Sequence, residues 1–309
     1  MMKQNIYISE ELDGKRLDFI VSAQVDSCSR ACAVDGILQG QILVNSCQKK
    51  PGYKVKHGDH ISLDIEVQEG SVSILPEETA LDIIYEDPYL IIINKKPGVV
   101  VHPAPGNMSN TLVNALLSHA PEIKMAGDDH FRSGIVHRLD KDTSGLMVVA
   151  KNQSALTFLQ KEFKQRRVEK RYLALVFGQM SESAGVIDLP IGRHPVKRQL
   201  MAVNHEDGKS AVTCWEIKQQ YKNACLLEVL LKTGRTHQIR VHFYAMDHPL
   251  IGDQVYQPRR FRKQKSMAQR QMLHSWKLSF RHPYSGQRVS FAADPPRDFM
   301  KIQSLLEND

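Results

Sequence analysis

The chain is organised around the stretch Gly134-Ile-Val-His-Arg-Leu-Asp-Lys-Asp-Thr-Ser-Gly145, which runs directly into the apolar segment Leu146-Met-Val-Val-Ala150. This apolar segment, and the pair Ile135 and Val136 before the charged residues, have the composition of buried strands. Between them lie two carboxylates, two fixed cations and a histidine. The arrangement predicts a polar loop held by a rigid sheet, where catalytic residues are often found. A solvated hairpin tip whose charges cancel is the alternative, so the rest of the chain has to decide.

Charge is distributed unevenly along the 309 residues, a length that suggests two domains. The whole chain has a net charge of +7. Residues 1–79 hold 8 Lys and Arg against 12 Asp and Glu, a net of −4, so the remainder has a net of +11. An anionic partner is therefore expected for the larger, C-terminal part.

Membrane insertion, disulfides and a zinc site are not expected. No apolar run approaches the roughly 20 residues that span a bilayer, and the first residues contain no apolar segment of signal-peptide type. The five cysteines form no Cys-x-x-Cys pair. The histidines at positions 102, 137 and 237 are expected to be structural rather than metal ligands. We therefore expect a soluble, cytoplasmic protein without a bound metal.

Residues 14–76 predict a small α+β domain. The apolar residues around Leu17 recur at helical spacing, and Ser27 or Ser29 is placed to cap a second helix. Strands are expected at residues 41–45 and 61–65. A polar linker precedes a larger domain, predicted to span residues 81–309.

The larger domain has clear periodic segments. Two strands are expected around the turn Glu86-Asp-Pro88, and a third helix is expected from Thr236, as its cap, to about Met246. The other expected elements are helices at 111–119 and 154–165 and strands at 146–150, 172–177 and 225–231.

Three stretches of this domain carry residues that could converge on one site. Asp140 lies in the charged loop, and a partly buried carboxylate stays ionised only beside a cation or hydrogen-bond donors. Arg240 can supply that cation, because helical spacing places it on the same face as His237, near the positive end of the helix. Tyr172 can stack on a nucleobase. The alternatives are a surface ion pair for Arg240 and a core position for Tyr172.

Two basic segments are candidate phosphate-binding surfaces. Six Lys and Arg residues fall within 161–171, more than a solvated helix end requires. Six more fall within 257–270, ending at Arg270, where little apolar content predicts a mobile basic loop that becomes ordered on an anion. A plain solvated face is the alternative for the first of these segments.

Three segments resemble the signature sequences of the RluA-type pseudouridine synthases. They are His137-Arg-Leu-Asp-Lys-Asp-Thr-Ser-Gly-Leu146, Lys170-Arg-Tyr172 and Thr233-Gly-Arg-Thr-His-Gln-Ile-Arg-Val-His242. The order of residues from Arg16 to Asp59 resembles the S4 RNA-binding domain. The resemblance implies an α+β pseudouridine synthase fold, with a mixed, mainly antiparallel sheet and a central catalytic cleft. It also implies a small N-terminal S4-like α+β domain.

The resemblance implies a role for each aligned residue. Asp140 aligns with the catalytic aspartate, Arg240 with the arginine that pairs with it, and Tyr172 with the tyrosine that stacks on the target base and is a candidate acceptor of its C5 proton. Arg138 aligns with the residue that fills the space left by the flipped base. The other expected substrate contacts are Arg235, His237 and Leu250. The expected RNA-backbone contacts are Lys164, Arg166, Arg167, Lys170, Arg171, Arg259, Arg260, Arg262, Arg30 and Lys54.

The implied reaction breaks the N1–C1′ bond of a uridine, rotates the free base and rejoins it through C5. The resemblance implies no metal and no cofactor, and a monomeric enzyme whose partner is the 23S RNA of the large ribosomal subunit or a pre-ribosomal particle. Asp140 could attack C1′ as a nucleophile or remove a 2′ proton. A silent RNA-binding factor would not need Asp140, Tyr172 and Arg240 together. A zinc-dependent deaminase would need a Pro-Cys-x-x-Cys ligand set, which the sequence lacks.

Overall fold

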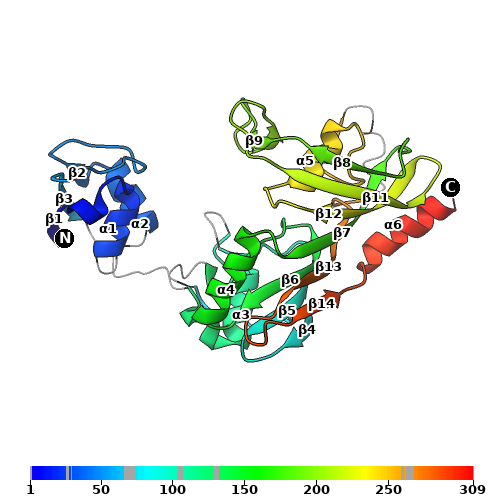
Figure 1. The fold of residues 1–309 in the computed structure, drawn as a ribbon, viewed down its shortest axis with the longest axis horizontal. Helices are drawn as coiled ribbons and strands as arrows, with labels where there is room; N and C mark the ends of the chain where they lie inside the picture. The colour runs from blue at the N-terminus through cyan, green and yellow to red at the C-terminus, as the bar shows by residue number, and fades with distance from the viewer. Residues whose placement is uncertain are drawn as a thin grey trace. The chain divides into compact units, whose positions relative to one another are not determined.

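The computed structural model describes residues 2–25, 28, 30–65, 74–103, 107–127, 132–258, 261 and 268–308. The chain divides into two compact units, Met1–Ser73 and Ile74–Asp309, which Figure 1 colours from blue at the N-terminus to red at the C-terminus. The domain boundaries 14–76 and 81–309, and the S4 likeness of the first unit, stay predictions.

The N-terminal unit is a three-stranded antiparallel sheet, in the order β1-β3-β2, with two helices. Its elements are β1 (Met2–Tyr7), the short 3-10 helix η1 (Glu10–Leu12), α1 (Leu17–Gln24), α2 (Arg30–Leu38), β2 (Ile42–Val44) and β3 (His60–Ile65). One apolar core joins Leu17 and Ile20 of α1 to Ile37 of α2 and to the buried faces of the strands. The two predicted helices and two predicted strands are confirmed, whereas the candidate caps Ser27 and Ser29 lie outside the described residues.

The C-terminal unit is built on a nine-stranded sheet in the order β4-β5-β6-β13-β7-β12-β11-β8, with β14 paired to β13 (Figure 1). Its strands are β4 (Ile83–Glu86), β5 (Leu90–Lys95), β6 (Ser144–Ala150), β7 (Glu169–Phe177), β8 (Ala184–Asp188), β11 (Val212–Gln220), β12 (Ala224–Leu231), β13 (Leu273–Arg281) and β14 (Arg288–Ala292). The pair β6 and β13 is parallel, and every other pair described in this sheet is antiparallel. The predicted mixed, mainly antiparallel sheet is confirmed. A separate hairpin joins β9 (Ile191–Arg193) to β10 (Met201–Val203).

Helices cover both faces of this sheet because successive strand residues point to opposite sides. The helices are α3 (Leu112–His119), the 3-10 helix η2 (Pro121–Met125), α4 (Gln153–Lys164), α5 (Gln238–Ala245) and α6 (Arg297–Glu307). In β5, Ile91 packs in the cluster that contains α3, whereas Leu90 packs with α4. In β7, Tyr172 shares the cluster of α3 and α5, whereas Leu173 packs with α6. Within the described residues, none of the helices combines the length and the apolar character that crossing a membrane requires.

The close approach of β6 to β13 fixes the point where the charged loop joins the sheet. These strands pair through His274 with Ser144 and Ser275 with Gly145. A Cβ atom on residue 145 would lie 2.3 Å from the carbonyl oxygen of Ser275, and the φ of +111° is one that side-chain-bearing residues rarely adopt. Glycine is therefore required at this position.

The apolar pair on the other side of the loop does not form a strand. Ile135 makes an isolated antiparallel bridge with Val149, and residues 136–140 have no regular secondary structure. The prediction of a buried strand here is wrong, because two apolar residues provide too few ladder hydrogen bonds to hold one. The loop before β6 therefore depends on other contacts for its position.

Candidate active site

A cavity of about 530 Å³ lies where the charged loop meets the end of β12. Its walls come mainly from three segments of the chain, within residues 136–143, 163–172 and 231–240. The sequence predicts a site from these same three stretches. The fold therefore brings together segments of which the first and last are about 100 residues apart in the chain.

Asp140 and Arg240 form an ion pair at this cavity. Arg240 donates from Nη1 to Oδ2 of Asp140 at 3.0 Å. From Nε and Nη2 it donates to the two carboxylate oxygens of Asp253, at 2.7 and 3.0 Å. The side chains of Asp253 and Arg240 are buried, whereas that of Asp140 is 19% exposed. Asp253 therefore fixes Arg240, and Asp140 is the most exposed of the three at the cavity, which Arg240 also lines.

The charges of this group support one another. Burial opposes the ionisation of Asp253, but the hydrogen bonds and charge of Arg240 outweigh it and hold the pKa of that carboxyl below its usual range. Burial likewise opposes the charge on Arg240, yet Asp253 and Asp140 raise the pKa of its guanidinium. A fixed positive charge therefore lies against Asp140.

His237 reaches the site by a route that differs from the prediction. The helix α5 begins at Gln238, and His237 is its N-cap in the left-handed conformation, with φ +57°. Thr236 as the cap is therefore wrong, because the side-chain oxygen of Gln238 accepts a hydrogen bond from the backbone N–H of Arg235 and closes the turn. Nε2 of His237 still lies 3.9 Å from Oδ1 of Asp140. Burial lowers the pKa of this imidazole.

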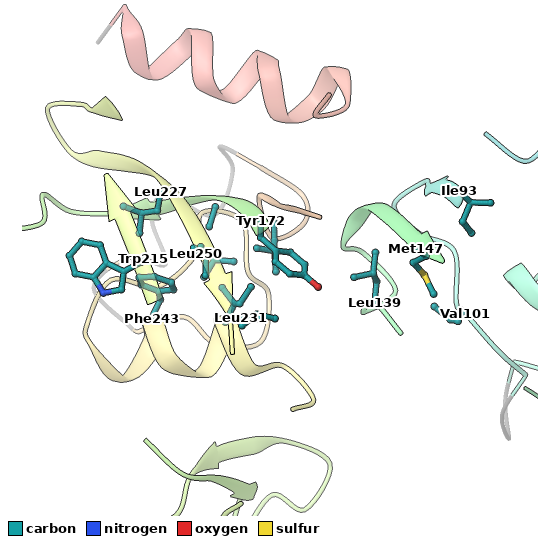
Figure 2. Packing of buried hydrophobic residues seen from close by; sticks show 14 of the residues in the cluster. Ile93, Val101, Leu139, Met147, Tyr172, Trp215, Leu227, Leu231, Phe243 and Leu250 are labelled. Atoms are coloured by element: carbon teal, nitrogen blue, oxygen red, sulfur yellow. The ribbon is translucent and has the colours of Figure 1, made fainter. Parts of the chain in front are cut away.

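Tyr172 is a core residue that also forms part of the cavity wall, whereas its stacking on a nucleobase stays a prediction. Its side chain is 5% exposed and shares a core cluster with Leu231 and Ile239. Figure 2 shows its hydroxyl directed toward the segment that carries Leu139. Burial raises the pKa of this phenol far above its ordinary value. A protonated aromatic ring at a cavity wall can stack against a planar base.

The other expected substrate contacts divide between the cavity and the core. Arg138 and Arg235 line the cavity, and Arg235 donates from Nε to the carbonyl of Ser210 at 3.1 Å. Leu250 is not among the lining residues: it is 1% exposed, forms a bridge with Val176 and lies in the core close to Tyr172 (Figure 2). Its predicted contact with the substrate has no support from this geometry.

The cations of the segment 161–171 separate into two groups. Lys164, Arg166 and Lys170 line the cavity, and burial lowers the pKa of Lys170 to about 8. Arg167 forms an ion pair with the buried carboxylate of Glu162. Arg171 forms ion pairs with Glu169 at 2.7 Å and with the buried Glu228 at 2.6 Å. The protein itself therefore neutralises Arg167 and Arg171.

The structure says little about the other residues that were predicted to contact RNA. Arg259, Arg260 and Arg262 lie outside the described residues, as does the side chain of Arg30, and Lys54 is exposed on the N-terminal unit.

The prediction that Arg270 belongs to a mobile basic loop is wrong. Arg270 is buried and donates to both carboxylate oxygens of Asp298, at 2.6 and 2.9 Å, and to the carbonyl of Asp142 at 3.0 Å. These hydrogen bonds hold Arg270 in a fixed position beside the charged loop.

Three residues at the site were not predicted: Asp253, Arg270 and Lys95. Lys95 is 3% exposed and donates from Nζ to the carbonyls of Lys96, Val99 and Lys141 at 2.9, 3.0 and 2.9 Å. A lysine at the end of the apolar strand β5 was the one available signal for it. No role was assigned to Asp253 or Arg270 from the sequence, because their partners, Arg240, Asp298 and Asp142, lie outside their own segments.

The histidine nearest to Asp140 in the sequence has a structural role, as expected. Nε2 of His137 accepts a hydrogen bond from the backbone N–H of Val148 at 3.1 Å, and its ring stacks on Phe163 with centroids 4.8 Å apart. Burial lowers its pKa to about 3. Among the residues that the structure describes, no group of three or more His, Cys, Asp or Glu side chains could hold a metal ion.

Known proteins are similar to this chain in sequence and in fold. A family model described as RNA pseudouridylate synthase matches residues 89–245. The ribosomal large subunit pseudouridine synthase D of Neisseria meningitidis serogroup B is 42% identical over 303 residues, which cover 96% of this chain and 80% of that protein. The synthase D of Escherichia coli K12 is 41% identical over 313 residues, which cover 98% and 94% of the two chains. The structure of human RNA pseudouridylate synthase domain containing 1 matches with a TM-score of 0.58 and 30% identity, covering 71% of this chain and 85% of that one.

The fold and the likeness together define an RNA-modifying isomerase. The chain belongs to the RNA pseudouridylate synthase family, which confirms the resemblance drawn from its three motifs.

Proposed function

We propose that this enzyme converts uridines of large-subunit ribosomal RNA to pseudouridine, with Asp140 as its catalytic residue. The observation that carries the proposal is the cavity itself, in which Arg240 holds the partly exposed carboxylate of Asp140 and Tyr172 forms another part of the wall. The substrate follows the names of the relatives, which are ribosomal large subunit pseudouridine synthases. A cytoplasmic monomer that acts on ribosomal RNA or a pre-ribosomal particle, without a metal or cofactor, belongs to the same proposal.

The two oxygens of Asp140 have different tasks in this proposal. Arg240 holds Oδ2 at 3.0 Å, whereas Oδ1 lies 3.9 Å from His237, too far for a hydrogen bond. Oδ1 is therefore the oxygen available to the ribose. It either attacks C1′ and takes the place of the departing N1, or removes the 2′ proton. The fixed positive charge of Arg240 lies against this carboxylate and orients it for both routes.

The target uridine has to leave its stack, at a cost of a few kcal/mol. Tyr172 offsets part of that cost by stacking on the flipped base. Its raised pKa keeps the phenol protonated at neutral pH, so its ring and its hydroxyl donor act, and not a phenolate base. Arg138, exposed beside the cavity, fills the space that the base leaves.

Phosphates on either side of the flipped nucleotide are assigned to Lys164, Arg166 and Lys170, the cations that line the cavity. Arg259, Arg260 and Arg262 would extend this surface, and Arg30 and Lys54 would contact RNA from the N-terminal unit if it acts as an S4 domain. Such contacts give an affinity that falls as salt rises.

The substitution Asp140→Asn tests the catalytic assignment, because it removes the charge at nearly constant size. Single-turnover formation of pseudouridine on a large-subunit ribosomal RNA fragment should fall by at least about 10³-fold, while RNA affinity stays nearly unchanged. Asp142→Asn, the same change two residues away, is the matched control and should retain activity. Wild-type rates in Asp140→Asn would refute the assignment.

The substrate is tested in a deletion strain. Carbodiimide primer extension along large-subunit ribosomal RNA should show missing pseudouridines that the wild-type chain restores and Asp140→Asn does not. An unchanged modification pattern in the deletion strain would mean that the RNA acted on is a different one.

A further inference from the structure

Tyr256 lies directly behind the candidate active site and contacts three parts of it. Its hydroxyl is 2.8 Å from Nδ1 of His237 and accepts a hydrogen bond from the backbone N–H of Met201 at 2.9 Å. Its ring lies 5.0 Å from the guanidinium carbon of Arg240. Its own backbone N–H donates to Oδ1 of Asp253 at 2.9 Å. The side chain is buried, so these contacts are its environment.

The hydrogen bonds at the Tyr256 hydroxyl determine where the proton of His237 lies. Met201 can only donate through its backbone N–H, so it occupies a lone pair of the hydroxyl oxygen. The hydroxyl proton then needs an acceptor, because a buried donor without a partner is costly. Nδ1 of His237 is the ring nitrogen at hydrogen-bond distance. It accepts that proton when the imidazole is neutral, and the ring's own proton must then be on Nε2.

The neutral imidazole is favoured by its surroundings. The charged groups that act on His237 are Asp140, Arg240, Asp253 and Arg138, and their effects oppose one another in sign. Burial is the largest influence and lowers the pKa of the ring. The Nε2–H group therefore faces the cavity, on the side of Asp140 Oδ1.

We propose that Tyr256 is a positioning residue that holds His237 as an Nε2–H donor to the uracil of the substrate. The inference rests on the proposed function. When the N1–C1′ bond breaks, its electron pair goes to the uracil ring, and negative charge spreads to the ring carbonyl oxygens. A fixed donor at one of these oxygens stabilises the departing base without giving up its proton. The charge leaves the ring when its electron pair forms the C5–C1′ bond, as Asp140 departs from C1′ or returns the 2′ proton. The proton of C5 is then lost and N1 gains one, so the base stays neutral.

A purely structural role for Tyr256 is the alternative, because its hydroxyl also binds the hairpin through Met201. The two roles differ in their effect on the tautomer of His237. The structural role affects folding alone, whereas the positioning role requires the imidazole to change its proton arrangement when the hydroxyl is removed.

The first test is spectroscopic and uses the full chain without RNA. Long-range ¹H–¹⁵N correlation spectra of the histidine-labelled protein report the tautomer of each ring, and the His237→Gln spectrum identifies which of the 13 histidines is His237. The wild type should show the Nε2–H form and Tyr256→Phe a mixture of both forms. Tyr244→Phe, on the exposed side of α5, is the control and should leave the spectrum of His237 unchanged. An Nδ1–H form in the wild type would overturn the proposal.

The second test compares two amides at position 237. The side-chain nitrogen of glutamine can take the place of Nε2, whereas that of asparagine takes the place of Nδ1. His237→Gln should therefore turn over RNA at least about tenfold faster than His237→Asn under saturating single-turnover conditions. Tyr256→Phe should lose about tenfold in the same rate, with little change in RNA affinity.

Equal rates for the two amide variants would overturn the assignment of the donor. A Tyr256→Phe protein that melts at lower temperature but keeps the wild-type tautomer and rate would have only a structural tyrosine. Failure of the proposed function would be distinguishable, because it would appear as wild-type activity in Asp140→Asn or as an unaltered pattern of pseudouridines, while the tautomer is measured without substrate.

Discussion

Arg240 is the residue on which the electrostatics of the site depend. A buried guanidinium that loses its counter-ion is strongly destabilising, and both routes proposed for Asp140 would consume its negative charge, by a covalent bond or by a proton. Asp253 resolves this conflict, because it holds two of the three guanidinium nitrogens in a fully buried, bidentate pair. Arg240 would therefore keep a counter-ion at every stage of the proposed reaction, in which Asp140 is the residue that reacts.

From the lowered pKa of His137 we expect the protein to lose stability at acid pH. Its buried ring accepts a hydrogen bond from Val148, and its pKa is lowered to about 3, whereas histidine in an unfolded chain titrates near pH 6.5. Between these values the unfolded chain binds a proton that the folded chain does not. This contribution to stability is therefore complete above about pH 6.5 and declines as the pH falls toward 3. His137→Gln cannot titrate and should flatten the profile, by about 3 kcal/mol of unfolding free energy between pH 7 and 4.

Urea unfolding at a series of pH values measures this difference. The exposed His205→Gln variant is the control and should follow the wild-type profile. Parallel profiles for His137→Gln and the wild type would show that His137 does not carry the acid sensitivity.

The charged loop is the element that most needs support, because it has no ladder hydrogen bonds of its own between residues 136 and 140. Two buried cations hold its carbonyl oxygens. Lys95 donates to that of Lys141, which also accepts from the backbone N–H of Gly98, and Arg270 donates to that of Asp142. The position of Asp140 is therefore set by residues on β5 and on the segment before β13.

Lys95→Met should destabilise the protein and slow the reaction. The substitution keeps the apolar stem but removes the donor to three carbonyl oxygens, for a loss of about 3 kcal/mol in unfolding free energy. Pseudouridine formation should fall more than RNA affinity, since the loop carries the reacting carboxylate. Lys96→Met, on the neighbouring exposed lysine, is the matched control. Equal unfolding midpoints for the two variants would show that Lys95 does not hold the loop.

The elements that the sequence predicted correctly are those with a long apolar repeat or a local cap. The helix α3 has both, with Thr111 accepting a hydrogen bond from the backbone N–H of Asn114. The hairpin of β9 and β10 was missed, because three-residue strands are too short for a repeat. The helix α6 was also missed, although Phe299, Ile302 and Leu306 form a helical face that could have indicated it.

The sequence predicted a site residue only where a chemically reactive side chain lies within a recognisable motif. Asp140, Arg240 and His237 each lie within a motif, so their segments were found. The supporting residues Asp253 and Lys95 were not, because what makes them important is a partner distant in the sequence. The same limit applies to Arg166 and Arg167, which are neighbours in one basic segment. Only the fold distinguishes the cation that pairs with Glu162 from the one that lines the cavity.

At the scale of the whole molecule, net charge alone does not locate the RNA surface. The chain carries 41 Lys and Arg, but many are already paired with carboxylates. Lys164 and Arg166 differ from these because they are exposed at the rim of the cavity. They should therefore contact phosphates directly, whereas cations that are already paired with carboxylates should act only through long-range attraction, which salt screens.

The double variant Lys164→Gln, Arg166→Gln tests this distinction. If both residues contact phosphates of unpaired RNA, the slope of log affinity against log salt should become shallower by about 1.4. The control is Arg281→Gln, Lys301→Gln, which removes the same charge at two exposed residues that do not line the cavity. Fluorescence anisotropy with a labelled ribosomal RNA fragment, between about 50 and 200 mM salt, measures both slopes. Equal changes in the two variants would mean that RNA responds to total charge, and that the cavity rim is not its contact surface.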